Sequence, residues 1–196
     1  LPFMIQSRKD LSFYLVEDAK RFKLTNWFKY QAKLIYGGED AHILRYLKTL
    51  RRYEYYHNNS KTVVCKLISY YYRYRWMRLS LRYNLHIGIN MVGYGFYMAH
   101  LSGGGIINCK SMGNYCSING GVIIGNKDKQ SEISIIGNNV KLSVGCKVFG
   151  KIIIGNNVII APNAVVVKSV PDNCIIAGIP AKIIKKEGIK VDIKLT

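Results

Sequence analysis

SIIGNNVKLSVGCKVFGKIIIGNNVIIAPNAVV, residues 134–166, decides the fold, because one residue class recurs in this stretch every six positions. The same period extends from Ile106 to Val170 and is broken only at Gln130. Counted from Ile106, the aliphatic or Met positions are Met112, Ile118, Ile124, Ile136, Leu142, Val148, Ile154, Ile160 and Val166. Four residues after these positions runs a second series of small or apolar residues: Cys116, Val122, Val140, Cys146, Ile152, Val158, Ala164 and Val170.

Two inward positions in every six residues fit neither an amphipathic helix nor a simple alternating strand. They fit short strands that are joined by tight corners and stacked coil on coil, so that each coil buries its aliphatic residues against the next. The corners are also present in the sequence, as Gly137-Asn138-Asn139 and Gly155-Asn156-Asn157, because Gly and Asn tolerate a positive φ. The spacing therefore predicts a solenoid of short strands in the second half of the chain.

The repeat resembles that of the hexapeptide-repeat acyltransferases, in which three hexads form one coil of a left-handed parallel β-helix. The ending VVVKSVPDN, residues 165–173, followed by AGIPAKIIKK, residues 177–186, is typical of their acetyl-CoA-dependent branch. The resemblance implies a mainly β fold, with a left-handed parallel β-helix over residues 86–184 and a C-terminal tail over 185–196. The left hand follows from the resemblance alone, since crossovers between parallel strands are usually right-handed. A solenoid with the same spacing and no chemistry is the alternative.

Residues 1–85 read as an α-helical N-terminal domain. Ser7 with Asp10 three residues later predicts the start of a first helix, as in a capping box. A second helix is expected around residues 26–36, where Gly37-Gly38 stops it. Glu39-Asp40 opens a third, which runs toward Tyr56, and a fourth is expected from about residue 61 to 83.

The fourth predicted helix interleaves aromatic and basic side chains in YYYRYRWMR, residues 70–78. Such a belt can lie on an anionic membrane surface, with rings at the headgroup boundary and arginines on phosphates. The alternative, which we favour, is that about half of the rings pack on neighbouring elements while the arginines are solvated. Peripheral contact with an anionic membrane, where a lipid-linked glycan is a plausible acceptor, therefore stays open.

Composition limits the classes of function that remain. The 196 residues are 49% hydrophobic, enough for one core or for a main domain with a small one beside it. No apolar run is long enough to span a membrane as a helix. The charged residues Arg8, Lys9 and Asp10 follow the opening residues directly, so we expect no signal peptide there. Five scattered cysteines without CxxC spacing read as core residues in a reducing cytoplasm, so we expect a cytoplasmic protein. The net charge of +18 attracts polyanions, but no nucleic-acid-binding motif accompanies it, so we expect no nucleic acid partner.

The candidate catalytic residue is His100, in the segment YMAHLSGGGI, residues 97–106. The step from Met98 to Ile106 is eight residues rather than six, so two extra residues bulge out where His100 stands. The segment is similar to that of serine acetyltransferases, in which the same step carries the catalytic histidine, and the resemblance implies that His100 is a general base. Imidazole suits this role because its ordinary pKa of about 6.5 leaves it able to accept a hydroxyl proton near neutral pH. The backbone N–H groups of Gly103, Gly104 and Gly105 are candidate oxyanion donors, with a flexible turn as the alternative.

What orients His100 stays open at this point. In serine acetyltransferases an Asp orients the catalytic imidazole, and near the corresponding point this sequence has Asn84 and His86. In that family a second acid directly precedes the catalytic histidine, whereas Ala99 precedes it here. A backbone carbonyl, Asn84 or His86 could take over the orienting role. His42 and His57 are expected to be surface or packing residues. No metal is expected, because the three-histidine spacing of the carbonic-anhydrase relatives is absent.

The expected acceptor follows from a second departure from the family. Serine acetyltransferases hold the carboxylate of serine with an Arg-His pair in the loop that corresponds to residues 126–134, NKDKQSEIS, which has neither Arg nor His. Losing this bidentate clamp removes much of the specificity for free serine. This combination of serine-acetyltransferase features without the carboxylate clamp resembles the enzymes of capsule, O-antigen and colanic-acid synthesis. The primary expectation is therefore O-acetylation of a sugar hydroxyl. Serine O-acetylation and a non-catalytic, membrane-docking trimeric scaffold are the alternatives.

The donor and the oligomer are likewise implied by the resemblance. Its members bind acetyl-CoA in a groove along the coils between neighbouring subunits, so a homotrimer is expected. A stack of coils also leaves flat sides that favour association. Matched motif to motif, the positions that face this groove are Val144, Pro162, Val167, Lys168, Lys182 and Lys185. The lysines suit phosphates as point charges, and for each of them an ordinary solvated Lys is the alternative.

Overall fold

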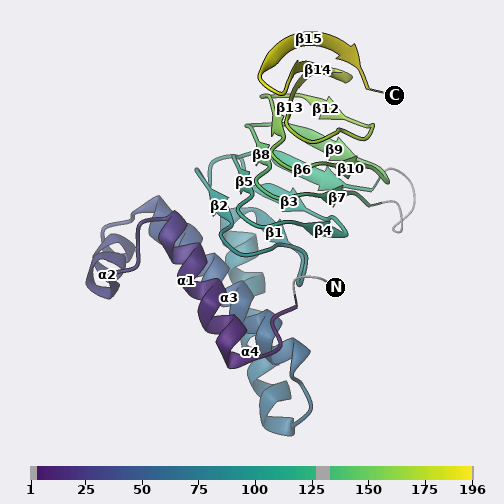
Figure 1. Ribbon diagram of the computed structural model, residues 1–196. Helices are drawn as coiled ribbons and strands as arrows, with labels where there is room; N and C mark the ends of the chain where they lie inside the picture. The colour runs from purple at the N-terminus through teal and green to yellow at the C-terminus, as the bar shows by residue number, and fades with distance from the viewer. Residues whose placement is uncertain (1–3, 127–132, 196) are drawn as a thin grey trace.

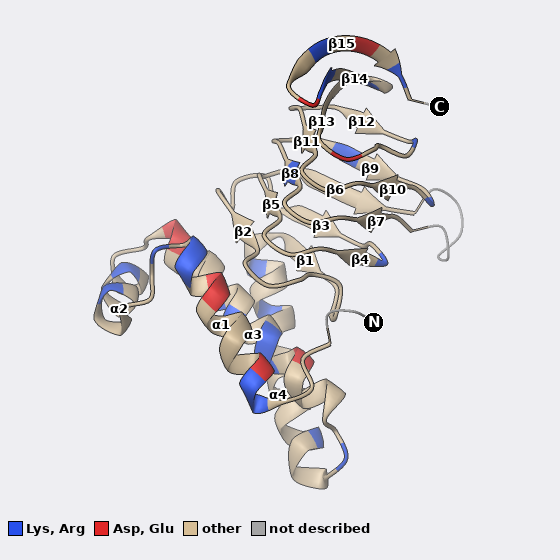
Figure 2. Ribbon diagram, in the orientation of Figure 1, with Lys and Arg blue, Asp and Glu red and all other residues tan. Residues whose placement is uncertain are grey.

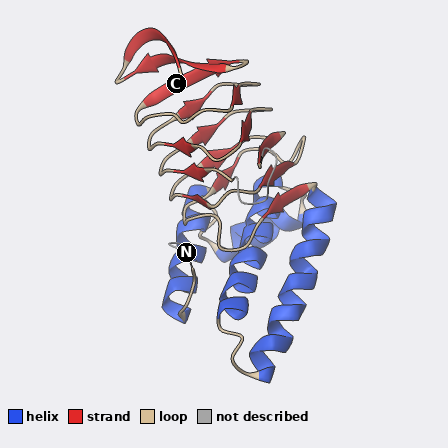
Figure 3. Ribbon diagram, turned by 90° about the vertical axis from the view of Figure 1, so that its right-hand side faces the viewer, coloured by secondary structure: helices blue, strands red, loops and turns tan. Residues whose placement is uncertain are grey.

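A computed structural model of the chain describes residues 4–126 and 133–195. In this part of the chain, helices come first and short strands follow, stacked in rungs above the helices (Figures 1 and 3). The helices are α1 (Arg8–Arg21), α2 (Trp27–Ile35), α3 (Glu39–Asn58) and α4 (Val63–Tyr83). The first six strands are β1 (Leu85–Ile87), β2 (Tyr97–Met98), β3 (Gly105–Ile107), β4 (Ser111–Met112), β5 (Ser117–Ile118) and β6 (Val122–Gly125). The others are β7 (Ile135–Ile136), β8 (Lys141–Leu142), β9 (Lys147–Phe149), β10 (Ile153–Ile154), β11 (Ile159–Ile160), β12 (Val165–Val166), β13 (Cys174–Gly178), β14 (Ala181–Lys186) and β15 (Ile189–Lys194).

The strands form three sheets, one for each side of the solenoid. Their orders are β1-β3-β6-β9-β12, β10-β7-β4 and β15-β14-β13-β11-β8-β5-β2. The pairing from β1 to β13 is parallel, and a regular coil advances eighteen residues, as from Lys147 to Val165. The predicted solenoid of parallel strands behind a helical region is therefore confirmed.

The hexad positions form the core of the solenoid. Every position of the first series from Met112 to Val166 is buried, and so is every position of the second series. The prediction is wrong at its first position, because Ile106 is 47% exposed and Ile107 is fully buried. In β3, Gly105 and Ile107 are buried and Ile106 is not, so the step from the inward residue Ile107 to Met112 is five residues rather than six. Four of the five cysteines, all except Cys65, are buried.

Asparagines hold the corners of successive coils together. Asn139 and Asn157 have φ values of 54° and 55°, as the Gly-Asn-Asn corners predict. The Asn139 amide donates to Asn157 Oδ1 over 3.0 Å, and the Asn157 amide donates to Asn173 Oδ1 over 2.8 Å. These bonds form a ladder along one edge. The loop residues 127–132, on which the expected absence of a carboxylate clamp partly depends, lie outside the described residues.

The helices begin close to where their caps predict. Ser7 Oγ accepts from the Asp10 N–H, and the Asp10 carboxylate accepts from the Ser7 N–H, which completes a capping box. Asn26 caps α2, and α3 begins at Glu39 directly after Gly38. The apolar face of α3 is buried against its neighbours. None of the described helices is long and apolar enough to cross a membrane.

The aromatic belt of α4 divides much as expected. Trp76 is buried, with its indole N–H donating to Tyr46 Oη over 3.0 Å, and Tyr72 stacks on Tyr56. Tyr70, Tyr71 and Tyr74 are exposed, together with several apolar side chains of the same helix. Packing thus accounts for part of the belt, and membrane contact by the rest stays a prediction.

The C-terminal residues close the far end of the solenoid. β14 and β15 run antiparallel to their neighbours and extend the sheet that ends in β13 (Figure 1). The expected boundary between residues 184 and 185 falls inside β14, so the expected tail continues the last sheet. Ala181, Ile183 and Leu195 are buried here and add to the core.

A buried ion cluster around Arg51 joins the helices to the first coil. The Arg51 guanidinium donates to Asp18 Oδ2 over 2.9 Å and to Glu54 Oε2 over 3.2 Å. It also donates to the backbone carbonyls of Val92 and Gly93, over 2.8 and 2.6 Å. The two acids also accept from first-coil amides, so every charge in the cluster is hydrogen-bonded. The cluster fixes α1 and α3 against the coil that carries His100.

Candidate active site

His100 stands on a turn between β2 and β3 that is longer than the other corners of its coil. β2 pairs with β5 so that Tyr97 lies beside Ser117, twenty residues later, instead of the regular eighteen. The two additional residues carry the imidazole out of the coil, as the sequence predicts. The His100 side chain is 70% exposed. A proton acceptor placed there is accessible to a substrate from outside the solenoid.

Glu39, in the first turn of α3, holds the imidazole in place. Glu39 Oε2 lies 3.1 Å from His100 Nδ1, and Glu39 Oε1 accepts a hydrogen bond from the Leu101 N–H. An ionised carboxylate only accepts hydrogen bonds, so Nδ1 carries the proton and Nε2 of the neutral ring is the free base. Placement at a helix N-terminus also favours the negative charge.

The carboxyl group of Glu39 stays ionised in this setting. Partial burial raises its pKa, but the hydrogen bonds from His100 and the Leu101 N–H outweigh burial, so the pKa of Glu39 lies below its ordinary value. A carboxylate that stays ionised stabilises the protonated imidazole that forms when His100 accepts a proton. The pair therefore has the orientation and the charge that general-base catalysis needs.

Sequence reasoning missed Glu39, and the structure places the two proposed partners elsewhere. Asn84 ends α4 in a left-handed conformation, with φ of 49°, and its carbonyl accepts from the Gly105 N–H over 2.9 Å. The His86 ring lies 5.2 Å from the Trp76 ring and faces the helices. The only signal for Glu39 was its position as a helix-start acid, which says nothing about a histidine 61 residues away.

The three glycines after His100 serve mainly to turn the chain. Gly103 and Gly104 have positive φ, and a Cβ on Gly104 would lie 2.1 Å from the Asn84 carbonyl oxygen. The Gly104 N–H donates to the Leu101 carbonyl, and the Gly105 N–H donates to that of Asn84. These two amides are therefore already paired, and the turn alternative holds for them. The oxyanion role stays a prediction for Gly103.

An open hollow of about 360 Å³ lies beside the turn, on the flank of β2, β5 and β8. Ala99, the neighbour of His100, forms part of its wall, and Arg21 reaches it from α1. Ser117, Asn119 and Ser143 add polar groups from two successive coils. The hollow can therefore take a polar ligand next to the imidazole.

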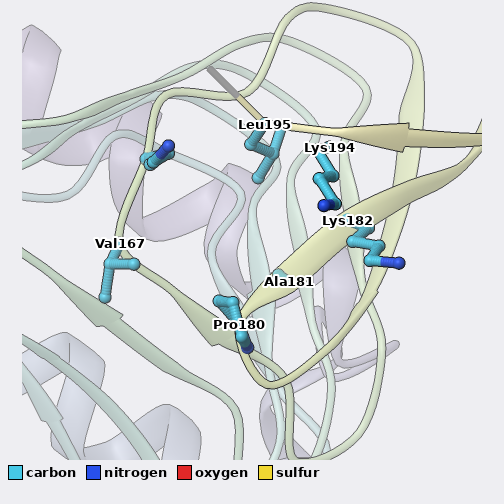
Figure 4. Close-up of a pocket in the computed structure, with 7 residues that line it drawn as sticks. Val167, Pro180, Ala181, Lys182, Lys194 and Leu195 are labelled. Atoms are coloured by element: carbon cyan, nitrogen blue, oxygen red, sulfur yellow. The ribbon is translucent and has the colours of Figure 1, made fainter.

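A second hollow, of about 150 Å³, brings together three of the six positions expected to face the acetyl-CoA groove (Figure 4). Its lining residues are Val167, Lys168, Pro180, Ala181, Lys182, Lys194 and Leu195. Val144 and Pro162 lie eighteen residues apart on successive coils, and the Asn163 N–H donates to the Val144 carbonyl over 2.9 Å. Lys185 lies further along β14 and does not line this hollow.

The two hollows lie at different heights on the solenoid. Four coil steps, β2 to β5, β8, β11 and β13, separate the His100 turn from the C-terminal hollow. At about 4.8 Å per step, the separation along the axis is roughly 19 Å. An extended ligand is needed to reach both.

The side chains that could bind a metal ion are scattered in the described structure. Among residues 4–126 and 133–195, no three His, Cys, Asp or Glu side chains come together in a way that could hold a metal ion. The acidic and imidazole groups of the candidate site form a pair, His100 and Glu39. Its geometry fits proton transfer.

Comparison with known proteins finds serine acetyltransferases among the relatives, although no family model matches the sequence. A serine acetyltransferase of Synechococcus elongatus is 38% identical over 117 residues, which cover 59% of this chain and 48% of the relative. One of Staphylococcus aureus is 32% identical over 137 residues, covering 69% of this chain and 62% of the relative. The chain thus spans about half to three fifths of the length of these relatives.

Solved structures agree on the fold. The chain is similar to serine acetyltransferases. The crystal structure of the Neisseria gonorrhoeae enzyme superposes with a TM-score of 0.64 at 21% identity and covers 94% of this chain and 70% of that one. The Brucella abortus enzyme in complex with coenzyme A gives a TM-score of 0.63 at 23% identity and covers 93% and 71%. The likeness to serine acetyltransferases therefore includes the helices as well as the solenoid.

Proposed function

We propose that the protein is an acetyl-CoA-dependent O-acetyltransferase in which His100 is the general base. The observation that carries the proposal is an exposed imidazole with its Nδ1 held by Glu39, which leaves Nε2 free to accept a proton. Serine acetyltransferase relatives in sequence and a shared fold support the same reaction class. A solenoid without chemistry gives no reason for an exposed imidazole to be held in this way.

The chemistry follows from the pair. His100 Nε2 accepts the proton of the acceptor hydroxyl while the hydroxyl oxygen attacks the thioester carbonyl carbon and the new C–O bond forms. Negative charge moves onto the carbonyl oxygen of the tetrahedral intermediate. When the intermediate collapses, the C–S bond breaks and the leaving thiolate of coenzyme A takes the proton back from the imidazolium. Glu39 stabilises the imidazolium between the two proton transfers.

The proposed donor site runs along the solenoid toward the C-terminal hollow. Serine acetyltransferases have been solved with coenzyme A, and acetyl-CoA is extended enough to place its thioester at one height and its phosphates at another. Lys168 and Lys194 offer positive charge at the C-terminal hollow, while Lys182 is paired with Asp192 at 3.5 Å. Val144 and Val167 are about half exposed on the flank. A homotrimer that covers this flank at each interface would enclose the donor, as the resemblance implies.

Two acceptors are considered, and a different observation supports each. The sequence relatives are serine acetyltransferases, which favours the serine hydroxyl. A sugar hydroxyl is supported by the loop at residues 126–134, whose sequence offers no Arg or His for a carboxylate clamp. The relatives make serine the first acceptor to test.

The test is acetyl transfer, measured as release of coenzyme A thiol with serine and with a panel of sugars and glycans as acceptors. His100→Ala should lower kcat by roughly 10² to 10⁴. His57→Ala, on the far part of α3, is the matched control and should leave kcat unchanged. Full activity of His100→Ala, or no acetyl transfer to any hydroxyl by a protein that binds acetyl-CoA, would contradict the proposal.

A further inference from the structure

Four arginines converge on one hollow in the helical region, far from the C-terminal hollow. It measures about 440 Å³ and opens between α3 and α4. Figure 2 shows that α3 and α4 both carry basic residues. The lining residues are Arg45, Tyr74, Arg75, Arg78, Leu79 and Arg82.

No acid among residues 4–126 and 133–195 pairs with these arginines. The sequence of α4 contains neither Asp nor Glu, and the lining of the hollow contains neither. Among the described residues, the ion pairs of the protein involve none of the four lining arginines. Within the described part of the chain, the Arg75 guanidinium donates one hydrogen bond, to the Tyr71 hydroxyl over 2.9 Å, and a guanidinium has five N–H donors in all. Four like charges held together repel one another, so an anionic ligand lowers the energy of the site.

The spacing of the arginines indicates the size of the anion. Arg75, Arg78 and Arg82 follow one another at helical spacing along one side of α4, and Arg45 faces them from α3. From Arg75 to Arg82 the helix rises by about 10 Å, more than one phosphate group occupies. Guanidinium groups bind phosphate oxygens in a fork, and a diphosphate offers enough oxygens and charge for several of them.

The surroundings indicate what the diphosphate is attached to. A second open hollow shares Arg45 and Arg75 with the first and continues toward α2. It adds Lys48 and Arg52 and the ring of Tyr30. A ligand can therefore place charged groups between α3 and α4 while an aromatic or polar group continues along the helices.

We propose that the hollow lined by Arg45, Arg75, Arg78 and Arg82 binds a diphosphate-bearing ligand, such as a nucleoside diphosphate or a lipid diphosphate. The site lies at the same end of α3 as the candidate active site. Arg45 follows Glu39 by six residues, a rise of about 9 Å, and Tyr83, next to Arg82, contacts His42. The inference does not depend on acetyl transfer, because binding is measured directly.

The experiment is calorimetric titration of the full chain with UDP at physiological salt, where weak surface attraction is largely screened. Arg78→Ala and Arg82→Ala should each weaken UDP binding by roughly 10- to 100-fold, because each removes charge-assisted hydrogen bonds. Arg73→Ala is the matched control. It removes the same charge from another face of α4, where Arg73 lines a different hollow, and should change the Kd by less than about twofold. Melting curves of all variants establish that they are folded.

Two further titrations separate the possible ligands. Titration with farnesyl diphosphate in detergent, compared with UDP, shows whether a lipid-linked or a nucleotide-linked diphosphate binds more tightly. Tighter binding of either ligand supports the proposal if Arg78→Ala abolishes that binding. Lys168→Ala, at the C-terminal hollow, should leave UDP binding unchanged, because the hollow between α3 and α4 is separate from the proposed donor site. The proposal is overturned if UDP and farnesyl diphosphate both fail to bind, if Arg73→Ala or Lys168→Ala weakens binding as much as Arg78→Ala, or if only anionic vesicles without diphosphate bind.

Discussion

Replacing Arg51 with Met tests the cluster that joins the helices to the first coil. Met is apolar and similar in length, so it fills the space without replacing the charge. Asp18 and Glu54 would then stay buried without their cation, and the carbonyls of Val92 and Gly93 would lose their donors. The change therefore leaves four acceptors short of a partner at once.

The expected loss of stability follows from burial. Arg51, Asp18 and Glu54 are all at most 1% exposed, so solvent cannot replace the lost interactions. Removing one partner of such a buried pair costs about 3–5 kcal/mol of unfolding free energy. For a chain of this length, each kcal/mol lowers Tm by about 2–4 °C, so a decrease of roughly 6–20 °C is expected.

The loss should also depend on pH. Burial raises the pKa of Glu54, although Arg51 and the Asn90 N–H oppose the shift. Without Arg51 the pKa of Glu54 rises further, so the folded variant takes up a proton more readily than the unfolded chain. The variant is then least stable relative to wild type near pH 7, and the difference shrinks as the pH falls toward 5.

The assay is thermal unfolding followed by circular dichroism at pH 7 and pH 5. Arg52→Met is the matched control, because the neighbouring Arg52 is partly buried and its one hydrogen bond among the described residues goes to the Lys48 carbonyl in its own helix, over 3.3 Å. The control should change Tm by no more than about 2 °C, as surface substitutions usually do. Equal Tm values for Arg51→Met and Arg52→Met would refute the view that the cluster holds the two parts together.

Three further predictions concern other features. Glu39→Gln should lower kcat only roughly two- to fivefold, because its pair with His100 is partly exposed and screened. Since the pKa of Glu39 is lowered in the folded protein, its carboxylate contributes stability at pH values above the ordinary Glu range, and this stability is lost as the pH falls through the lowered pKa. Melting curves of wild type and Glu39→Gln, recorded as a function of pH, measure this loss. Ser7→Ala should cost about 1 kcal/mol through loss of the helix cap, measured by urea unfolding; an unchanged midpoint would contradict the capping role. In the folded protein only Cys65 should react quickly with a disulfide reagent at pH 8. Burial raises the pKa values of Cys109, Cys116 and Cys146 to about 12, 11 and 12, and it also raises the pKa of Cys174.

The solenoid could be predicted from the sequence because its contacts repeat. Each hexad buries its apolar residues against the equivalent residues of the next coil, so a local pattern determines the long-range structure. The prediction is wrong at Ile106, because the coil has a longer turn before β3 and a step of only five residues, from Ile107 to Met112, after it. Past that point the pattern resumes, and every later apolar position of the two series that the structure describes is buried.

The candidate site was harder to predict, because it depends on how two unlike parts pack. The position of His100 was visible as an extended step in the repeat. Glu39 was not, since no periodicity relates a helix to a turn that follows it 61 residues later. The arginines of α4 looked like ordinary solvated charges, and only their convergence with Arg45 on α3 shows that they line a common hollow.

The bond between Glu39 and His100 crosses from one structural part of the chain to the other. A solenoid cut free of its helices could keep every coil and still lack the carboxylate that holds the imidazole. Exchanging the helical segment with that of a relative would likewise change the chemistry of a residue that the exchange leaves untouched. Efforts to alter acceptor choice by grafting should therefore move residues 39–58 together with the turn at residues 99–104.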